Sequence, residues 1–243
     1  MATARSEPFA QQACPQGVCD GSGWILGPED MARPCECREQ RLKRSRVRGV
    51  ASVIPPRYRG VSFDRPPLSD MARQAETREA VRKVSAFIEH LDSNLATGRG
   101  LWLFGDTGTG KTTLAMLASK EALEKGHSVA IYSLPKLLAR IRRTYDGEPG
   151  GDSYSAFFKR LTSVDLLHID DFGAEKRSDW VLEQLYALVN ERYEDERSVM
   201  LTTNLTMDKL EDQIGKRTVS RLTETCEQVP LFGADRRPDK APY

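Results

Sequence analysis

A glycine-rich loop that directly follows the apolar run at residues 101–104 holds the residues best suited to chemistry. Its three glycines let the backbone turn tightly enough for several N–H groups to point at phosphate oxygens, and the helix that follows adds its positive dipole end. Lys111 supplies a cation for the terminal phosphates, and the Thr112 hydroxyl can ligate Mg²⁺. The loop therefore predicts a site for a nucleoside triphosphate, with a turn that binds nothing as the alternative. The candidate binding residues are Gly105, Asp106, Thr107, Gly108, Thr109, Gly110, Lys111, Thr112 and Thr113.

Two carboxylates, Asp170 and Asp171, follow a second apolar run. In a doubly wound sheet the carboxyl ends of the strands meet at the ligand crevice, so these acids are expected to face the loop. Asp170 is placed to hold Mg²⁺, and Asp171 is placed to orient or deprotonate an attacking water. A pair of solvated acids at a strand end is the alternative. His168, inside the run, is expected to be a packed side chain and not a ligand.

Three further polar side chains complete the candidate catalytic set. Asn204 follows the apolar run at 199–203 and can hydrogen-bond the attacking water or the γ-phosphate, although a plain turn would give the same pattern. Arg217 and Arg221 are four residues apart and therefore share one helix face. One of them could stabilise the transferring phosphoryl group as an arginine finger, and an exposed basic face is the alternative.

The apolar patterning predicts the elements that position these groups. Nearly continuous apolar strands that alternate with helices favour a parallel sheet covered on both faces. The expected fold class is α/β, a P-loop NTPase with a five-stranded parallel sheet, helices on both faces and an abbreviated lid, over residues 69–243. Strands are expected at 101–104, 129–134, 164–169, 199–203 and 229–232. Helices are expected from a cap at Asp70 through Leu91, and at 112–125, 135–145, 179–196, 207–214 and 217–225.

The stretch before this domain contains four of the five cysteines and little apolar periodicity. Cys14, Cys19, Cys35 and Cys37 can supply four thiolates to a tetrahedral Zn²⁺, which would explain how a stretch with so little core folds. Four unconnected reduced thiols are the alternative. Residues 1–40 are therefore a candidate zinc module. Residues 41–68 read as a basic arm and proline-containing linker, with contact to a phosphate backbone as a second role.

Composition and length restrict the remaining possibilities. The 243 residues allow one sizeable α/β domain and a small appendage. The 36 basic and 35 acidic residues nearly cancel, so the global charge gives no information, for or against, about a nucleic-acid partner. No apolar run is long enough to cross a bilayer, and the start lacks the apolar core of a signal peptide. We expect a cytoplasmic protein with reduced cysteines and no membrane partner.

In this order the motifs resemble those of the AAA+ ATPases: Walker A at 105–112, Walker B at 166–171, sensor-1 Asn204 and an arginine-bearing box at 217–221. Asp-Asp-Phe-Gly at 170–173, Thr-Thr-Asn at 202–204 and the segment 215–222 resemble more narrowly the DnaC/DnaI helicase-loader and IstB branch. The resemblance matches Arg221 to the finger that reaches a neighbouring subunit's ATP. It matches Arg237 to sensor 2, and the cysteine block to the zinc-bearing module that contacts the replicative helicase in DnaI-type loaders.

The resemblance implies an ATP-dependent DNA replication protein that loads or remodels a replicative helicase. ATP would be hydrolysed between self-associated subunits, and slowly, because Asp171 stands where AAA+ proteins generally carry Glu. Assembly or DNA would stimulate turnover. Single-stranded DNA is a further expected partner, for which basic residues flanking the loop at 146–152 are candidates: Arg140, Arg142, Arg143, Lys159 and Arg160.

Three alternatives remain open from the sequence. An IstB-like transposition helper ATPase shares the fold, although that branch usually lacks a cysteine module. A nucleotide-sensing adaptor with little turnover is suggested by Asp171. A small-molecule P-loop kinase would need a substrate pocket and a mobile arginine lid, and neither is evident in the sequence.

Overall fold

The computed structural model describes residues 14–20, 24–26, 31–38, 54–145, 152–173 and 175–236. Three predictions fall wholly or mostly outside these ranges: the basic arm, the loop at 146–152 and Arg237. Contacts divide the chain into two units, Met1–Arg46 and Val47–Tyr243. Within the described ranges, no helix combines the length and the apolar character needed to pass through a membrane.

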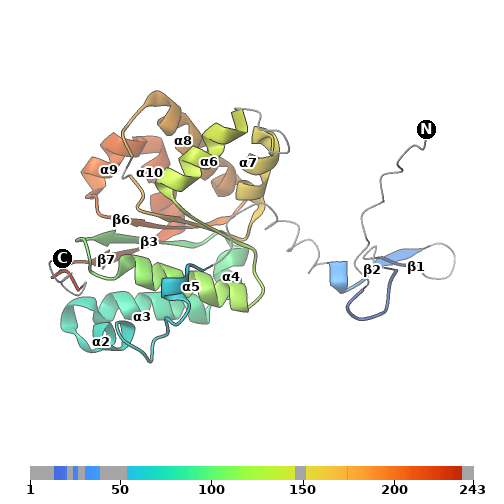
Figure 1. Cartoon of the computed structure of the whole chain (residues 1–243), viewed down its shortest axis with the longest axis horizontal. Helices are drawn as coiled ribbons and strands as arrows, with labels where there is room; N and C mark the ends of the chain where they lie inside the picture. Colours follow the sequence, from blue (N-terminus) through green and yellow to red (C-terminus); the bar gives the residue numbers. More distant parts are fainter. Residues whose placement is uncertain are drawn as a thin grey trace, which may run out of the picture. The chain divides into compact units, whose positions relative to one another are not determined.

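The larger unit contains a five-stranded parallel sheet with the strand order β4-β5-β6-β3-β7 (Figure 1). Successive side chains of β3 point to opposite faces, so Leu101 and Leu103 join one core cluster and Trp102 joins the other. Both faces are buried, which explains why the strands read as nearly continuous apolar runs. The predicted fold class is confirmed. The strands are β3 (Gly100–Gly105), β4 (Val129–Ser133), β5 (Leu166–Asp170), β6 (Ser198–Thr203) and β7 (Cys226–Leu231).

Helices cover the sheet on both faces (Figure 1). One face carries α2 (Leu68–Arg73), α3 (Ala75–Glu89), α4 (Leu91–Ala96) and α5 (Lys111–Glu124), and the 3₁₀ turn η2 (Pro56–Tyr58) packs against α5. The other face carries α6 (Leu134–Tyr145), α7 (Tyr154–Ser163), α8 (Asp179–Glu194), α9 (Met207–Ile214) and α10 (Lys216–Thr225).

A buried guanidinium fixes the end of the sheet opposite the glycine-rich loop. Arg192 of α8 is fully buried and donates to the carbonyl oxygens of Leu161, Val164 and Ser198 at 2.6, 3.0 and 2.6 Å. Burial, with the nearby charge of Arg197, lowers the pKa of Arg192 to about 9, so it stays charged at neutral pH. Leu161 belongs to α7, Val164 precedes β5 and Ser198 opens β6. Arg192 therefore joins β5, which leads to the candidate acids, to β6, which leads to Asn204.

The single helix expected from a cap at Asp70 is wrong. The structure has two helices there: Asp70 lies inside α2, and Gln74, with an extended ψ of 134°, separates α2 from α3. The break is stabilised because Leu68 and Met71 are buried and the Thr77 hydroxyl donates to the carbonyl of Met71 at 2.7 Å. The α3 helix ends before Leu91, which opens α4. Helices α4 and α7 were not predicted, and β7 begins three residues earlier than the predicted strand at 229–232.

The smaller unit contains a two-stranded antiparallel sheet, β1 (Trp24–Leu26) and β2 (Ala32–Pro34). Cys19 precedes the first strand, whereas Cys35 and Cys37 follow the second. The hairpin therefore brings together cysteines that lie 16 and 18 residues apart in the sequence.

Candidate active site and cysteine cluster

The glycine-rich loop connects β3 to α5. Gly105 (φ 132°) and Gly110 (φ 102°) have backbone angles that favour glycine. A Cβ at Gly105 would lie 2.0 Å from the carbonyl oxygen of Leu231, so the loop also needs glycine there for a close approach to β7. Local sterics thus select glycine at both ends of the loop, and α5 begins directly after it.

Lys111 is the first residue of α5, and its side chain is buried inside the loop. Its Nζ donates to the carbonyl oxygen of Gly105 at 3.0 Å and to that of Asp106. The ammonium is therefore fixed where the loop's N–H groups and the helix dipole add to its positive potential. This arrangement suits the β- and γ-phosphates of a nucleotide.

Other loop residues hold the loop's shape. The Thr109 hydroxyl donates to the carbonyl of Asp106 at 2.9 Å, and Asp106 Oδ2 accepts from the N–H of Gly233 at 3.0 Å. The N–H of Arg236 donates to the carbonyl of Gly108 at 3.0 Å. Consequently the segment after β7 is bonded to the phosphate loop as far as Arg236.

Hydroxyl groups from α5 and β6 converge on Asp170, the last residue of β5. Thr112 Oγ1 donates to Asp170 Oδ1 at 2.8 Å, and Thr202 Oγ1 donates to the same oxygen at 2.6 Å. A hydroxyl and a carboxylate within hydrogen-bond distance of each other are the oxygen ligands that Mg²⁺ prefers beside a phosphate. Thr112 and Asp170 therefore fit a magnesium ion. Sequence reasoning missed Thr202, whose only signal is a hydroxyl at the end of an apolar strand.

Asp171 lies one residue past β5 with a φ of 55°, a left-handed conformation in which Asp and Asn are enriched. Its N–H donates to Thr202 Oγ1 at 3.0 Å. Burial raises the pKa of the Asp171 carboxyl, the charge of Asp170 raises it further, and Lys111 opposes both. The Asp171 carboxyl therefore holds a proton more readily than the carboxyl of an exposed aspartate does.

A cavity of about 270 Å³ joins these groups. The predicted site residues that line it are Thr107, Gly108, Gly110, Lys111, Thr112, Thr113, Asp170, Asp171 and Asn204. Arg57 and Tyr58 from η2 line the same cavity, and the sequence analysis did not place them there. The loop, both acids and the amide thus face one space at the carboxyl end of the sheet.

His168 is packed, as the sequence indicated. It lies on β5 with no exposed surface, and its Nδ1 is 2.9 Å from Ser119 Oγ of α5. Burial lowers the pKa of His168 to about 4, so the ring is neutral at neutral pH.

Arg217 and Arg221 lie elsewhere. Both line a separate cavity of about 400 Å³ between α8 and α10, and neither is among the residues lining the cavity beside Lys111. The Arg221 guanidinium lies 4.9 Å from the ring centroid of Tyr193 and 5.5 Å from that of Tyr186. Its Nη1 is 4.0 Å from Glu194 Oε1. The structure therefore does not bring these arginines to the chain's own phosphate loop.

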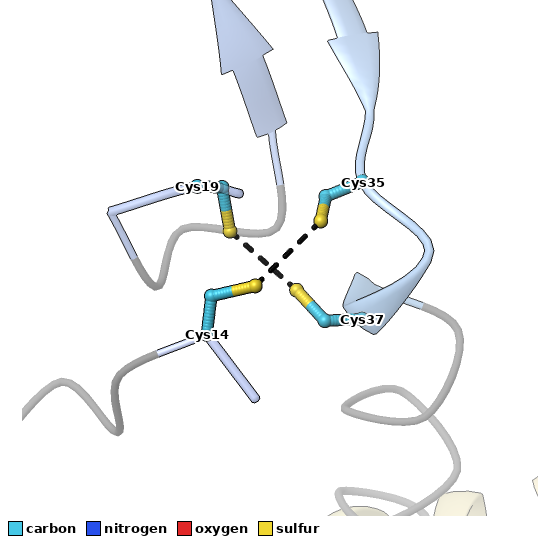
Figure 2. Close-up of side chains that lie close together, drawn as sticks. All are labelled: Cys14, Cys19, Cys35 and Cys37. Carbon is cyan, nitrogen blue, oxygen red and sulfur yellow. Dashed lines mark hydrogen bonds between the residues drawn. The ribbon is translucent and has the colours of Figure 1, made fainter. Parts of the chain in front are cut away.

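Four sulfur atoms of the smaller unit point toward one another (Figure 2). Cys14 Sγ is 3.8 Å from Cys35 Sγ, Cys19 Sγ is 3.5 Å from Cys37 Sγ, and all four lie within 4.8 Å of one another. A tetrahedral zinc with Zn–S bonds of about 2.3 Å needs S···S distances of about 3.8 Å. The four thiols are free and fit such a site. Burial and the neighbouring thiols raise the pKa of Cys37 above its usual range.

Comparison with known proteins adds family membership to this geometry. The family model for IstB-like ATP binding proteins matches residues 73–240. The replicative helicase loader DnaC of Escherichia coli K12 is 26% identical over 186 residues, which cover 76% of this chain and 72% of that protein.

Two solved structures show a similar fold. A crystal structure of the DnaC helicase loader has a TM-score of 0.62 at 24% identity and covers 73% of this chain and 99% of that one. The replication initiator DnaA bound to AMPPCP and single-stranded DNA has a TM-score of 0.58 at 24% identity and covers 73% and 50%. Since the family model matches more than half of the residues, and the phosphate loop and its acids share one cavity, this chain belongs to the family of IstB-like ATP binding proteins, on the AAA+ branch that includes DnaC.

Proposed function

We propose that this chain is an ATPase that loads or remodels a replicative DNA helicase and hydrolyses ATP between subunits. The observation that carries the proposal is the division of the candidate catalytic set. Lys111, Asp171 and Asn204 line one cavity, whereas Arg221 lines another. A second copy of the chain is then needed to complete the site. The helicase as client is supported by the similarity to the replicative helicase loader DnaC of Escherichia coli K12, 72% of whose length is covered.

Each group at the cavity has a proposed role in hydrolysis. The loop N–H groups and Lys111 bind the β- and γ-phosphates and fix them against the sheet. Thr112 and Asp170 would hold Mg²⁺, which neutralises phosphate charge when bound. Asp171 orients the attacking water and draws its proton, and Asn204 donates a hydrogen bond to that water or to the γ-phosphate.

Arg221 is the proposed finger in trans, so Arg221→Ala is expected to lower ATP turnover at least about tenfold, because charge in the transferring group loses its stabilising cation. ATP affinity should change little, since Arg221 does not line its own nucleotide cavity. Turnover measured against protein concentration checks this, because a site shared between subunits gains activity as the chain assembles.

The matched control is Arg217→Ala, which removes the arginine one turn earlier on α10. If only Arg217→Ala loses turnover, the role of arginine finger belongs to Arg217 and not to Arg221. Wild-type turnover per chain that stays constant over a wide dilution series would contradict a finger in trans.

The cysteine cluster is proposed to bind one structural zinc, in a module that contacts the helicase. We expect about one zinc per chain in the purified full-length protein, because four thiols at tetrahedral spacing match the ion's preferred ligand set. Cys35→Ser should lose the metal, and Cys226→Ser, which alters a thiol of β7, should keep it. Elemental analysis of the wild type and of the two variants measures the zinc content of each. A folded wild-type chain without zinc would overturn the proposal.

Single-stranded DNA is a proposed second partner, and a column of aromatic rings supports it. Tyr145 stacks on Tyr154 with centroids 5.1 Å apart, and Tyr154 stacks on Phe158 at 5.4 Å. Tyr145 is exposed, so a base can extend the stack. Two of the predicted basic candidates are partly neutralised, because Arg140 and Arg160 both pair with Asp152.

Co-purification tests the function directly. The tagged full-length chain is mixed with a hexameric replicative helicase, ATP and single-stranded DNA, and we expect ATP-dependent retention of the helicase followed by its transfer to the strand. Retention of a transposase instead would favour a transposition helper, the alternative that the resemblance to the IstB branch leaves open. ATP binding without turnover, with or without the DNA strand, would favour a nucleotide-sensing adaptor.

A further inference from the structure

Two residues at the nucleotide cavity belong to none of the motifs that define it. Arg57 and Tyr58 line the cavity together with Lys111, Asp170 and Asp171. They come from η2, which precedes β3 by about 40 residues in the sequence. The inference drawn from them rests on the proposed ATP site and adds a residue to it.

The segment around η2 is fastened to the helix that the phosphate loop opens. The ring of Tyr58 is half-buried and packs against the core cluster that includes α5. The N–H of Val61 donates to the carbonyl of Tyr58 at 3.1 Å, and Lys120 Nζ of α5 donates to the carbonyl of Val61 at the same distance. The backbone of Arg57 is therefore held in place relative to the loop.

The side chain of Arg57 is held as well. Its guanidinium carbon lies 4.6 Å from the centroid of the Tyr58 ring. A cation over an aromatic face is attracted by the ring quadrupole. Arg57 is exposed, yet its guanidinium is already placed beside the cavity. It would therefore lose less side-chain entropy on binding a ligand than an arginine on a free segment would.

Tyr58 lies close to the acid-bearing side of the cavity. Burial raises the pKa of the Tyr58 hydroxyl, Arg57 opposes that rise, and the charges of Asp170 and Asp171 add to it. The ring is thus within the electrostatic reach of both acids, which end β5 where the terminal phosphate is expected. Among the described residues, the charged ones that line the cavity are two cations, Arg57 and Lys111, and the same two acids.

Because the two cations and the two acids at the cavity are equal in number, the phosphates of a bound nucleotide would give Arg57 a partner of opposite charge. With Asp170 committed to a metal ion and Lys111 to the phosphates, a triphosphate brings more negative charge than Lys111 alone offsets. A guanidinium forms paired, charge-assisted hydrogen bonds to phosphate oxygens. We propose that Arg57, held against the ring of Tyr58, is a second phosphate-binding cation of the nucleotide cavity and favours ATP over ADP through the γ-phosphate.

Dissociation constants for ATP and ADP test the proposal. Arg57→Ala is expected to weaken ATP binding about tenfold and ADP binding less than about twofold, because one charge-assisted contact to the terminal phosphate is lost. Arg57→Lys keeps the charge without the paired geometry and should fall between. Arg65→Ala, which removes an exposed arginine from the same segment outside the cavity lining, is the matched control and should bind both nucleotides as the wild type does.

Tyr58 is a positioning residue, and its variants separate the ring from the hydroxyl. Tyr58→Phe should keep the ATP preference, since the face under Arg57 remains, and Tyr58→Leu should lose part of it. The thermal midpoint of each variant, measured alongside, shows that folding is intact. An ATP-to-ADP affinity ratio in Arg57→Ala equal to that of the wild type would overturn the proposal.

Failure of this inference differs from failure of the ATP site itself. If Lys111→Ala abolishes ATP binding while Arg57→Ala leaves the ATP-to-ADP ratio unchanged, the site stands and Arg57 has no role in it. If Lys111→Ala binds ATP normally, the cavity is not the nucleotide site.

Discussion

Replacing Lys111 with alanine is expected to weaken ATP binding at least about a hundredfold, because charge-assisted hydrogen bonds to two phosphates are lost together. The effect should be large because the ammonium is buried within the loop and oriented by the carbonyls of Gly105 and Asp106. Titration calorimetry with ATP and Mg²⁺ measures the change.

Lys136→Ala is the control for this loss. Lys136 is an exposed lysine of α6 outside the cavity lining, so its removal lowers the total charge equally and should leave ATP affinity unchanged. Unchanged affinity in Lys111→Ala would contradict the assignment of the loop. A circular dichroism spectrum like that of the wild type confirms that the variant is folded.

Asp171→Asn is expected to bind ATP normally and to hydrolyse it at least about a hundredfold more slowly, the range associated with loss of a general base. Asparagine is a suitable probe here because it tolerates the left-handed φ of 55° at this position. The backbone bond from residue 171 to Thr202 Oγ1 does not depend on the side chain, so it should persist. Single-turnover hydrolysis separates chemistry from product release.

A second variant addresses the unusual residue at this position. Asp171→Glu restores the acid that AAA+ proteins generally carry, yet glutamate is less often found at positive φ. Faster turnover in Asp171→Glu would mean that the shorter side chain limits the rate. If Asp171→Asn hydrolyses ATP as fast as the wild type does, a role for the Asp171 carboxylate in hydrolysis is excluded.

The sequence predicted those parts of the site whose residues lie next to one another in the chain. Gly105 to Thr112 is one continuous loop, and Asp170 and Asp171 end an apolar strand, so spacing and the rule for parallel sheets place them at one edge. The sheet itself was predictable for the same reason, since β3, β5 and β6 are buried on both faces and read as apolar runs.

The parts that the sequence did not predict depend on tertiary contacts. Arg57 and Tyr58 reach the cavity only because η2 packs on α5, and no periodic pattern marks a three-residue turn. Thr202 acts through a hydrogen bond to a neighbouring strand. The break at Gln74 is held by the bond from Thr77 to Met71, a contact between residues that one continuous helix would separate. Arg237 stays a prediction, because it lies outside the described residues.

Arg221 is separated from the nucleotide cavity of its own chain. Its guanidinium lies against Tyr186 and Tyr193 on the side of α8, so the cavity beside Lys111 contains no finger from its own chain among the residues described as lining it. A head-to-tail arrangement of subunits places one surface of a chain against a different surface of the next. Such an arrangement can bring Arg221 of one copy to the ATP of another.

Mixing two variants that are each impaired in turnover tests this arrangement most directly. Arg221→Ala keeps the nucleotide site and lacks the finger, whereas Asp171→Asn keeps the finger and lacks the base. If ATP is hydrolysed between subunits, an equimolar mixture recovers about a quarter of the wild-type turnover, since random head-to-tail neighbours pair an intact site with an intact finger at that frequency. A mixture no more active than the sum of the two separate variants would contradict the shared site.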